Sequence, residues 1–554
     1  MHRFINNKDA CYYEKPESAE LYIGALPSIA CLTTASLYRN KKLTTYRVLA
    51  MSYEYSNKPA TLDLTGSIPE KTMTPNSDSR DLERDSIGIM GIVFFVIAAA
   101  APLTVVVALF PVIIGSGNGI GIAGAFVAVA LVLLLFAVGY VAMSKHITNA
   151  GAFYAYITKG IGRPMGLGSA SLAIFSYNAI QLGLYGGIGY YLNELLGKQL
   201  NVHLPWWVYS FTAMAMCLWL GLRRLHAGAV VLAVLLTLET AIILILDLGI
   251  LFGDHSVPAS QFSFEPFSPS AAFSGAIGVA LMFAHASFIG FEGTAIYGEE
   301  ARDPKRTVPI ATYIAVIFMG VFYALTAWLI INAIGANEAV AVAKDQSGNL
   351  IFWVSDKILG GWATELFQAL VITSLFAAIV TFHSNVARYL YSLGRQGLLS
   401  DKLGSTHPLQ KSPHVACYVQ TAMVAIVVAI FAVLGLNPYD TLFTWFTGVG
   451  AAGIITIQCI ASIAIFVFFR RSKVDKRMWH TFLAPLLSVA GLLPFLYFAL
   501  TSFDVLLGVQ GALEVFFMTL LFGSFALGFL GAFYLSVRSP EKYARLESSL
   551  GDQV

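Results

Sequence analysis

The sequence predicts an all-α membrane protein with twelve transmembrane helices. The chain has 554 residues, of which 57% are hydrophobic and 12% charged, whereas soluble domains carry roughly 25% charged residues. Apolar runs that are long enough to cross a ~30 Å hydrocarbon core recur from about residue 87 to residue 535. Lys and Arg gather in alternate connections between these runs, as is typical of membrane-spanning helices.

Each expected helix is an apolar run of about 18 residues or more with few charges. In chain order, the twelve runs are 87–114, 120–143, 165–195, 205–222, 226–252, 271–297, 309–334, 363–393, 415–434, 441–469, 481–500 and 511–537.

The positive charges orient these helices. Of the 23 Lys and Arg residues after position 86, 19 lie in connections on one side and three on the other, with Arg388 inside a helix. Short cytoplasmic connections hold such residues preferentially. We therefore expect a multi-pass protein of the plasma (cell inner) membrane, embedded in the lipid bilayer, with both termini in the cytoplasm.

Residues 1–86 differ from the rest because they are polar and have no helical periodicity. We expect a cytoplasmic tail that is disordered or an upstream extension of the reading frame, with Met73 as an alternative start. The remainder divides into a first repeat at 87–252, a second at 271–469, two further helices at 479–537, and a cytoplasmic tail at 538–554.

Missing motifs exclude several classes of protein. The chain has no G-x-x-x-x-G-K-[ST] phosphate loop, no H-E-x-x-H zinc helix and no T-V-G-Y-G channel filter. Gly119, Gly121 and Gly124 satisfy G-x-G-x-x-G, but they open an apolar helix instead of following a strand, so helix packing explains them better. The net charge of +2 gives no basic patch for nucleic acid. We expect no enzyme activity, cofactor or metal, and a carrier driven by existing gradients remains.

Two expected helices contain helix-breaking residues near their middle. The first has AAAAPLT at 98–104, where Pro102 lacks an amide donor, and the sixth has SFIGFEG at 287–293. A helix can break in the membrane only where protein or a water-filled cavity satisfies its freed backbone groups, and carriers hold substrates at such breaks. The alternative is a packing kink.

The two breaks occupy corresponding positions in helices one to five and six to ten. The first helix begins in the cytoplasm and the sixth outside, so the halves have opposite topology. Paired broken helices in inverted repeats are a strong pointer to a binding site. The sequence therefore predicts a 5+5 inverted repeat with two extra helices, inferred from helix count and break position.

Ionisable residues inside the membrane are functional candidates by default. Glu239 lies near the middle of the fifth helix and could take up and release a proton as the coupling group; a structural hydrogen-bonding partner is the alternative. Glu292, in the sixth helix, could meet a substrate ammonium or form a gate, or it could have a structural role. His285 is better explained as a core histidine, and Asp247 lies near an outer helix end and receives no role.

Other candidates line the expected cavity or its cytoplasmic side. Tyr177 and Asn178 belong to a polar stripe on the third helix, which could face the substrate or bond neighbouring helices. Phe291 is a candidate aromatic gate or a packing residue. The connection after the sixth helix could form an ion-paired cytoplasmic gate from Glu299, Glu300, Arg302 and Arg306, or its basic members could serve orientation alone.

Three segments carry a family resemblance. The stretch FIGFEGTAIYGEEARDPKRTVPIA (288–311) resembles the sixth helix and following loop of amino acid-polyamine-organocation permeases. Supporting similarities are NAGAFYAYITKGIGRPMG (149–166) and RYLYSLGRQGLLS (388–400). The resemblance covers about residues 85–535. It implies a broken-helix inverted-repeat fold and alternating access around a substrate held by helices one, three, six, eight and ten.

By position, the resemblance implies which residues would surround the substrate. They are Ala99, Ala100, Ala101, Pro102, Leu103 and Thr104 at one end of the substrate, and Ser287, Phe288, Ile289, Gly290, Phe291 and Glu292 at the amine end. In many relatives the first helix is broken at a small glycine-serine-glycine segment that holds a substrate carboxylate. This chain lacks that segment. It is similar to a bacterial branch that includes putrescine importers, so recognition of an α-amino acid does not follow automatically.

The expected function is import of an amino acid or related amine with a proton as coupling ion. A polyamine importer or exchanger is the alternative within the class, and a channel is the alternative from another class.

Overall fold

The computed structural model describes residues 35–39, 42–46, 88–147, 153–223, 228–254, 257–296, 301–407, 410 and 412–548. The chain divides into two units, residues 1–74 and 75–554. In the first unit, strands β1 (Ala35–Arg39) and β2 (Lys42–Tyr46) pair antiparallel, with Ala35 opposite Tyr46. The other expectations for residues 1–86 fall outside the described residues.

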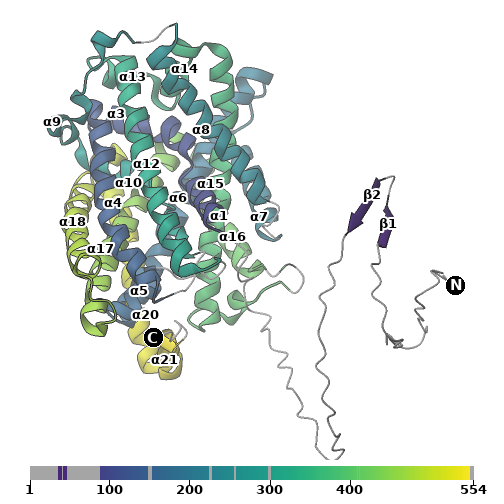
Figure 1. The fold of residues 1–554 in the computed structure, drawn as a ribbon, viewed down its shortest axis with the longest axis vertical. Coiled ribbons are helices and arrows are strands. Elements are labelled where there is room, and N and C mark those ends of the chain that lie inside the picture. The colour runs from purple at the N-terminus through teal and green to yellow at the C-terminus, as the bar shows by residue number, and fades with distance from the viewer. Residues whose placement is uncertain are drawn as a thin grey trace, which may run out of the picture. The chain divides into compact units, whose positions relative to one another are not determined.

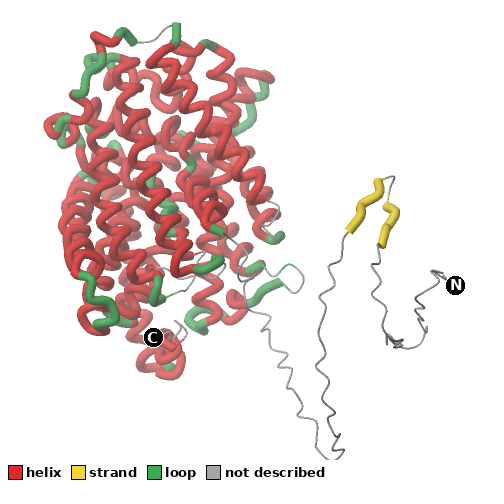
Figure 2. Tube along the Cα trace, viewed as in Figure 1, coloured by secondary structure: helices red, strands yellow, loops and turns green. Residues whose placement is uncertain are grey.

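The described part of the second unit is a bundle of helices (Figures 1 and 2). Up to the end of the second break, the elements are α1 (Ile89–Ala100), α2 (Pro102–Thr104), the π-helical turn η1 (Val105–Leu109), α3 (Phe110–Ser116), η2 (Gly119–Gly121), α4 (Ile122–Ser144), α5 (Phe153–Gly160), α6 (Arg163–Leu200), α7 (Trp206–Gly221), α8 (Gly228–Phe252), η4 (Ala259–Gln261), η5 (Glu265–Phe267), α9 (Pro269–Ala272), α10 (Ile277–Ala286) and α11 (Gly293–Ile296).

The remaining elements follow in the same pattern of long helices and short connections. They are α12 (Pro304–Ile334), α13 (Ala339–Gln346), η7 (Ser347–Asn349), α14 (Leu350–Leu359), α15 (Gly361–Arg395), η8 (Asp401–Gly404), α16 (His414–Val433), η9 (Pro438–Phe443), α17 (Thr444–Ser472), η10 (Trp479–Leu483), α18 (Ala484–Thr501), α19 (Phe503–Leu507), α20 (Ala512–Arg538) and α21 (Pro540–Ser548). In Figure 1, α13 and α14 lie at one end of the bundle and α5 and α21 toward the other.

Nine helical segments in the described residues are long and apolar enough to cross a membrane. Three of the twelve expected spans are not among them. The fourth corresponds to α7, which has 16 residues, and the sixth is shortened to the 10 residues of α10 by the break after it. The third corresponds to α6, a 38-residue helix whose buried side carries many Gly, Ser, Tyr and Gln residues.

Helix α6 lies at the centre of the packing. It contacts α5, α7, α15, α17, α20 and η9. Small residues permit this close approach: a Cβ at Gly186 would lie 2.6 Å from the Pro438 carbonyl oxygen, and one at Gly183 would lie 2.4 Å from the Thr447 hydroxyl. The polar side chains of α6 therefore point into the protein, where they can reach the interrupted helices.

Candidate functional site

The first break lies within the predicted segment 98–104. Helix α1 ends at Ala100, Ala101 has left-handed backbone angles (φ 48°, ψ 71°), and Pro102 begins α2. The Ala101 amide still donates to the carbonyls of Ile97 and Ala98 (3.0 and 3.2 Å). Proline at the first position of a helix leaves no amide unsatisfied, whereas a left-handed alanine is strained by about 1–3 kcal/mol. The surrounding packing must hold this conformation.

Glu239 lies on α8, beside the first break. Its side chain is buried, with 2% of its surface exposed. Its hydrogen-bond partners are the Ser374 side chain on α15 and the Leu103 backbone in α2. Ser374 in turn accepts from the Thr104 amide and hydroxyl (3.3 and 3.1 Å). The predicted coupling residue is thus part of a buried network that joins α2, α8 and α15.

This network uses the backbone donors at the start of α2. Pro102 has no amide hydrogen, the Leu103 backbone is bonded to Glu239, and the Thr104 amide is bonded to Ser374. A carboxylate that bound here would have to displace these partners. Side chains from α8 and α15 therefore take up the backbone donors at the start of α2.

The second break extends from Ser287 to Glu292, between α10 and α11. Several of its amides bond three residues back instead of four, as in Phe288 to His285 (3.0 Å) and Ile289 to Ala286 (3.1 Å). Gly290 has φ +124°, a conformation that a side chain disfavours. The chain winds through a series of tight turns at the predicted site.

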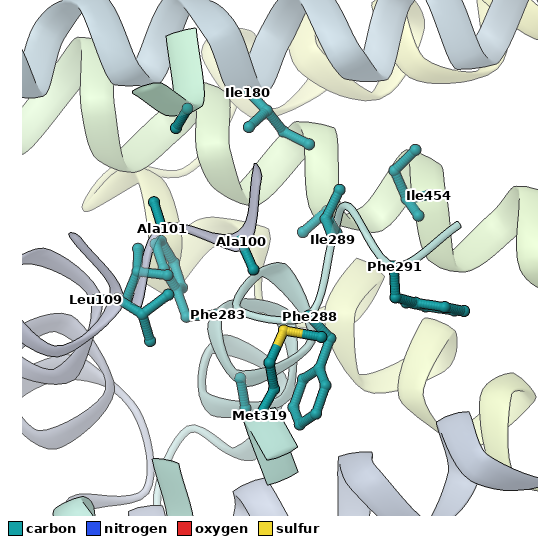
Figure 3. Packing of buried hydrophobic residues seen from close by; sticks show 14 of the residues in the cluster. Ala100, Ala101, Leu109, Ile180, Phe283, Phe288, Ile289, Phe291, Met319 and Ile454 are labelled. Atoms are coloured by element: carbon teal, nitrogen blue, oxygen red, sulfur yellow. The ribbon is translucent and has the colours of Figure 1, made fainter. Parts of the chain in front are cut away.

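The two breaks touch at Gly290. A Cβ on this residue would lie 2.8 Å from the Ala99 Cβ and 3.3 Å from the Ala100 amide nitrogen. Figure 3 shows Ala100 and Ala101 on the unwound part of the first break, beside the loop that carries Ile289 and Phe291. Glycine at position 290 thus permits backbone contact between the two interruptions.

Glu292 lies inside the second break with no exposed surface. One carboxylate oxygen accepts from the Tyr177 hydroxyl (2.7 Å) and the other from the Gly290 amide (2.9 Å). The Tyr140 hydroxyl donates to the Glu292 backbone carbonyl (2.8 Å). Two tyrosines from α4 and α6 therefore fix both the backbone and the side chain of this residue.

Neither carboxylate is neutralised by a basic side chain. Within the described residues, neither Glu239 nor Glu292 forms a salt bridge with a Lys or Arg side chain. Burying an unpaired carboxylate is costly. The acid beside the first break and the acid within the second are therefore both buried, and a proton or a cationic ligand would stabilise each.

The two polar-stripe residues of α6, Tyr177 and Asn178, have different partners. Tyr177 contacts the second break through Glu292, and its ring lies 5.8 Å from that of Tyr389 on α15. Asn178 instead donates to the Ile174 carbonyl of its own helix (2.8 Å). The structure joins Tyr177 to the second break, whereas the bonds of Asn178 do not reach either break.

The other residues of the second break are packed by apolar groups. The Phe288 ring lies 6.0 Å from that of Tyr323 on α12, and the Phe291 ring lies 6.0 Å from that of Phe136 on α4. Both phenylalanines and Ser287 are fully buried, and the Ser287 hydroxyl donates to the Phe283 carbonyl of α10 (2.9 Å). In this conformation Phe291 packs against aromatic side chains.

The proposed cytoplasmic gate is only partly described. Glu299 and Glu300 lie outside the described residues, while Arg302 and Arg306 are exposed at the start of α12. The ion-paired gate therefore stays a prediction. His285 is fully buried in the core, as expected from the sequence, but only its Nε2 has a partner, the Gln458 side-chain oxygen at 2.9 Å; its Nδ1 has none among the described residues.

Sequence reasoning missed several residues of these networks. Ser374 and Tyr140 bond to the breaks from 270 and 152 residues away in the chain, so no local signal marks them. Asp247 was expected near an easily solvated helix end, but the structure buries it, with 7% of its surface exposed. A signal for Asp247 existed, because it lies eight residues after Glu239 on the same helix.

The helical region is similar to known transporters. Residues 87–527 match the profile of the family described as "Amino acid permease". The low-affinity putrescine importer PlaP of Escherichia coli (strain K12) is 24% identical over 433 residues, which cover 76% of this chain and 89% of the relative. The branched-chain amino acid permease BcaP of Bacillus subtilis (strain 168) is 22% identical over 371 residues, covering 63% of this chain and 73% of the relative.

Proposed function

Because the match over residues 87–527 makes this chain a member of the amino acid permease family, we propose that it imports an amino acid or related amine by alternating access. The chain is a multi-pass membrane transporter and not an enzyme, since its relatives are permeases and transporters and its helices are of membrane-spanning type. The substrate, the coupling ion and the membrane are parts of the proposal.

The proposed architecture has twelve spans in the plasma membrane. Residues 87–252 and 271–469 form the two inverted repeats, 479–537 the two extra helices, and both termini are cytoplasmic. The nine apolar spans, together with α6, α7 and the interrupted α10, support this count. The 19 Lys and Arg residues on one side against three on the other support the orientation.

Glu292 is the proposed binding group for the substrate amine. The observation that carries this proposal is its complete burial at the contact of the two breaks, where its carboxylate accepts hydrogen bonds from the Tyr177 hydroxyl and the Gly290 amide and has no basic partner among the described residues. Because a buried carboxylate without a cation is unfavourable, an ammonium group bound there would offset the cost. The packed aromatic residues around Phe288 and Phe291 would exclude water from the bound substrate.

Glu239 is the proposed proton-coupling group. It reaches the backbone of the first break and links it to Ser374. Protonation of this carboxylate would remove its charge and turn one of its oxygens from an acceptor into a donor. The bonds that hold the start of α2 would then change with the protonation state, which couples proton uptake to movement of the first break.

A second candidate function is import of a polyamine such as putrescine. The occupied amides of Leu103 and Thr104 favour it, because they leave no free donor for a substrate carboxylate in this conformation. A diamine would need two anionic partners instead, and the structure has one buried acid beside the first break, Glu239, and one within the second, Glu292.

Transport of matched substrate pairs tests both candidates. We expect the purified protein in proteoliposomes to show saturable uptake and counterflow of labelled substrate, and greater accumulation when the exterior is acidic. Ornithine with putrescine, and leucine with isopentylamine, are pairs that differ only by the α-carboxylate. Preference for the first member of a pair supports an amino acid carrier, and preference for the second an amine carrier. Flux without saturation or counterflow would indicate a channel and contradict the proposal.

A further inference from the structure

We propose that Asp247 is a second proton-binding carboxylate, which passes protons between the external surface and Glu239 along the interface of α8 and α12. The inference rests on the proposed proton-coupled transport. It concerns a residue outside both breaks, on the face of α8 that packs into the protein.

Asp247 is buried, and only one of its two carboxylate oxygens has a hydrogen-bond partner among the described residues. Its Oδ2 accepts a hydrogen bond from the Thr326 hydroxyl on α12 (2.8 Å), whereas its Oδ1 has no partner among the described residues. With 7% of its surface exposed, Asp247 is too enclosed for water to solvate it freely. An acid in the apolar part of a membrane protein is costly unless it binds a proton or a partner. The open Oδ1 is the place where a proton would bind.

Asp247 and Glu239 share one stripe of α8. The buried residues of this stripe include Ile242, Ile243 and Leu246, and the residues on the opposite face, such as Leu244 and Leu248, are exposed. Eight residues separate the two acids, which corresponds to about 12 Å along a helix. Because Asp247 lies five residues before the end of α8 at Phe252, it is nearer than Glu239 to the proposed external side.

Tyr323 on α12 has a buried hydroxyl near Glu239. It is fully buried, and its hydroxyl has no hydrogen-bond partner in the described part of the chain. The Tyr323 hydroxyl is close enough to the Glu239 carboxylate for the two groups to interact electrostatically. Thr326, the partner of Asp247, follows three residues later on α12. On α12, the Tyr323 hydroxyl is thus near Glu239, and the Thr326 hydroxyl is bonded to Asp247.

In the proposed relay, the Tyr323 phenol stays neutral while a proton moves from Asp247 to Glu239. A proton from the external side binds Oδ1 of Asp247. Because the Tyr323 hydroxyl is hydrogen-bonded to neither acid among the described residues, a bridging water on each side would carry the proton: the phenol oxygen accepts one proton while its own hydrogen passes toward Glu239, so the phenol remains neutral. The proton ends on the Glu239 carboxylate, and Asp247 is ionised again.

The surroundings of Asp247 contain few competing charges. The elements that pack against α8 are α1, α2, α12, α14 and α15. Their titratable residues are Lys305, Arg306, Tyr313 and Tyr323 on α12, Asp356 and Lys357 on α14, and Glu365, His383, Arg388, Tyr389, Tyr391 and Arg395 on α15. Asp356, Lys357 and Glu365 are exposed. No group of three or more His, Cys, Asp or Glu side chains suited to a metal occurs in the described residues.

The variant Asp247→Asn tests the relay in proteoliposomes. The probe is whichever of labelled putrescine and labelled leucine the wild type transports faster. We expect counterflow to persist in the variant, and an acidic exterior to stop raising accumulation above the level without a gradient. Glu365→Gln, which alters an exposed acid on α15, is the matched control and should accumulate substrate like the wild type. Accumulation by Asp247→Asn equal to that of the wild type would overturn the inference.

Two further variants separate a relay from a structural role. Tyr323→Phe should keep counterflow and slow the acidification that a pH dye inside the vesicles reports during uptake. Thr326→Val keeps Asp247 but removes its bond to α12, so we expect accumulation to persist with a shifted dependence on external pH. If Thr326→Val lowers counterflow and accumulation equally, Asp247 is structural and the inference is wrong. Failure of the proposed function is distinct, because the wild type itself would then show no saturable uptake.

Discussion

The two breaks achieve the same interruption by different chemistry. The first uses a left-handed alanine followed by proline, and it is closed by Glu239 and Ser374 from two other helices. The second uses Gly290 and contains its own acid, Glu292, which bonds to the amide of Gly290. Both breaks are therefore tied to distant helices, but the acid at the first comes from α8, whereas the acid at the second belongs to the break itself. This difference suits the first break to coupling and the second to binding.

The largest expected effect comes from Gly290→Ala, which places a methyl group at the contact between the breaks. The added Cβ would lie 2.8 Å from that of Ala99, at a residue with φ +124°. We expect a loss of stability of about 2 kcal/mol or more, seen as a lower melting temperature in detergent, and loss of uptake. Gly523→Ala is the control, because nothing lies within 4 Å of that position. Normal uptake by Gly290→Ala would show that the contact is dispensable.

Glu292→Gln should have the next largest effect, on binding. The amide keeps the size of the side chain and can still accept from Tyr177, but it has no charge for an ammonium group. We expect substrate affinity to fall by about 10- to 100-fold, since hydrogen bonds to charged groups contribute about 1.5–3 kcal/mol. Equilibrium binding of labelled substrate measures this. Tyr177→Phe keeps the charge and should weaken binding less; the opposite order would contradict the role of Glu292.

Ser374→Ala sharpens the account of the first break. It removes the link between Glu239 and Thr104, and we expect a smaller loss of stability, about 1 kcal/mol. Thermal unfolding in detergent measures it. Ser384→Ala on the same helix is the control, because its hydroxyl bonds only to the Val380 carbonyl of α15. Equal effects of the two substitutions would mean that the Ser374 network adds nothing.

The smallest effect is expected far from both breaks. Hydrogen bonds from Arg477 lower the pKa of Asp475 to about 2 in the connection after α17. A lowered pKa gives stability above the ordinary value near 4 that is lost as the pH falls through about 2. Asp475→Asn should therefore lower the melting temperature slightly and equally from about pH 8 to pH 5, with the difference narrowing below about pH 4. An effect on transport would show that this pair is not merely local.

The sequence indicated the breaks but not their partners. Pro102 and Gly290 act on the backbone next to them, so local reasoning located both interruptions. The Tyr177–Glu292 bond joins residues 115 positions apart, which depends on helix packing that no single segment encodes. The burial of Asp247 has the same origin, because it depends on the helices that pack against α8 and not on the place of Asp247 along α8.

Counterflow by Glu239→Gln, measured together with pH-driven accumulation, tests the division of labour between the breaks most directly. The account predicts that this variant exchanges labelled substrate across the membrane but no longer concentrates it when the exterior is acidic. Accumulation equal to that of the wild type would contradict the assignment of coupling to the first break.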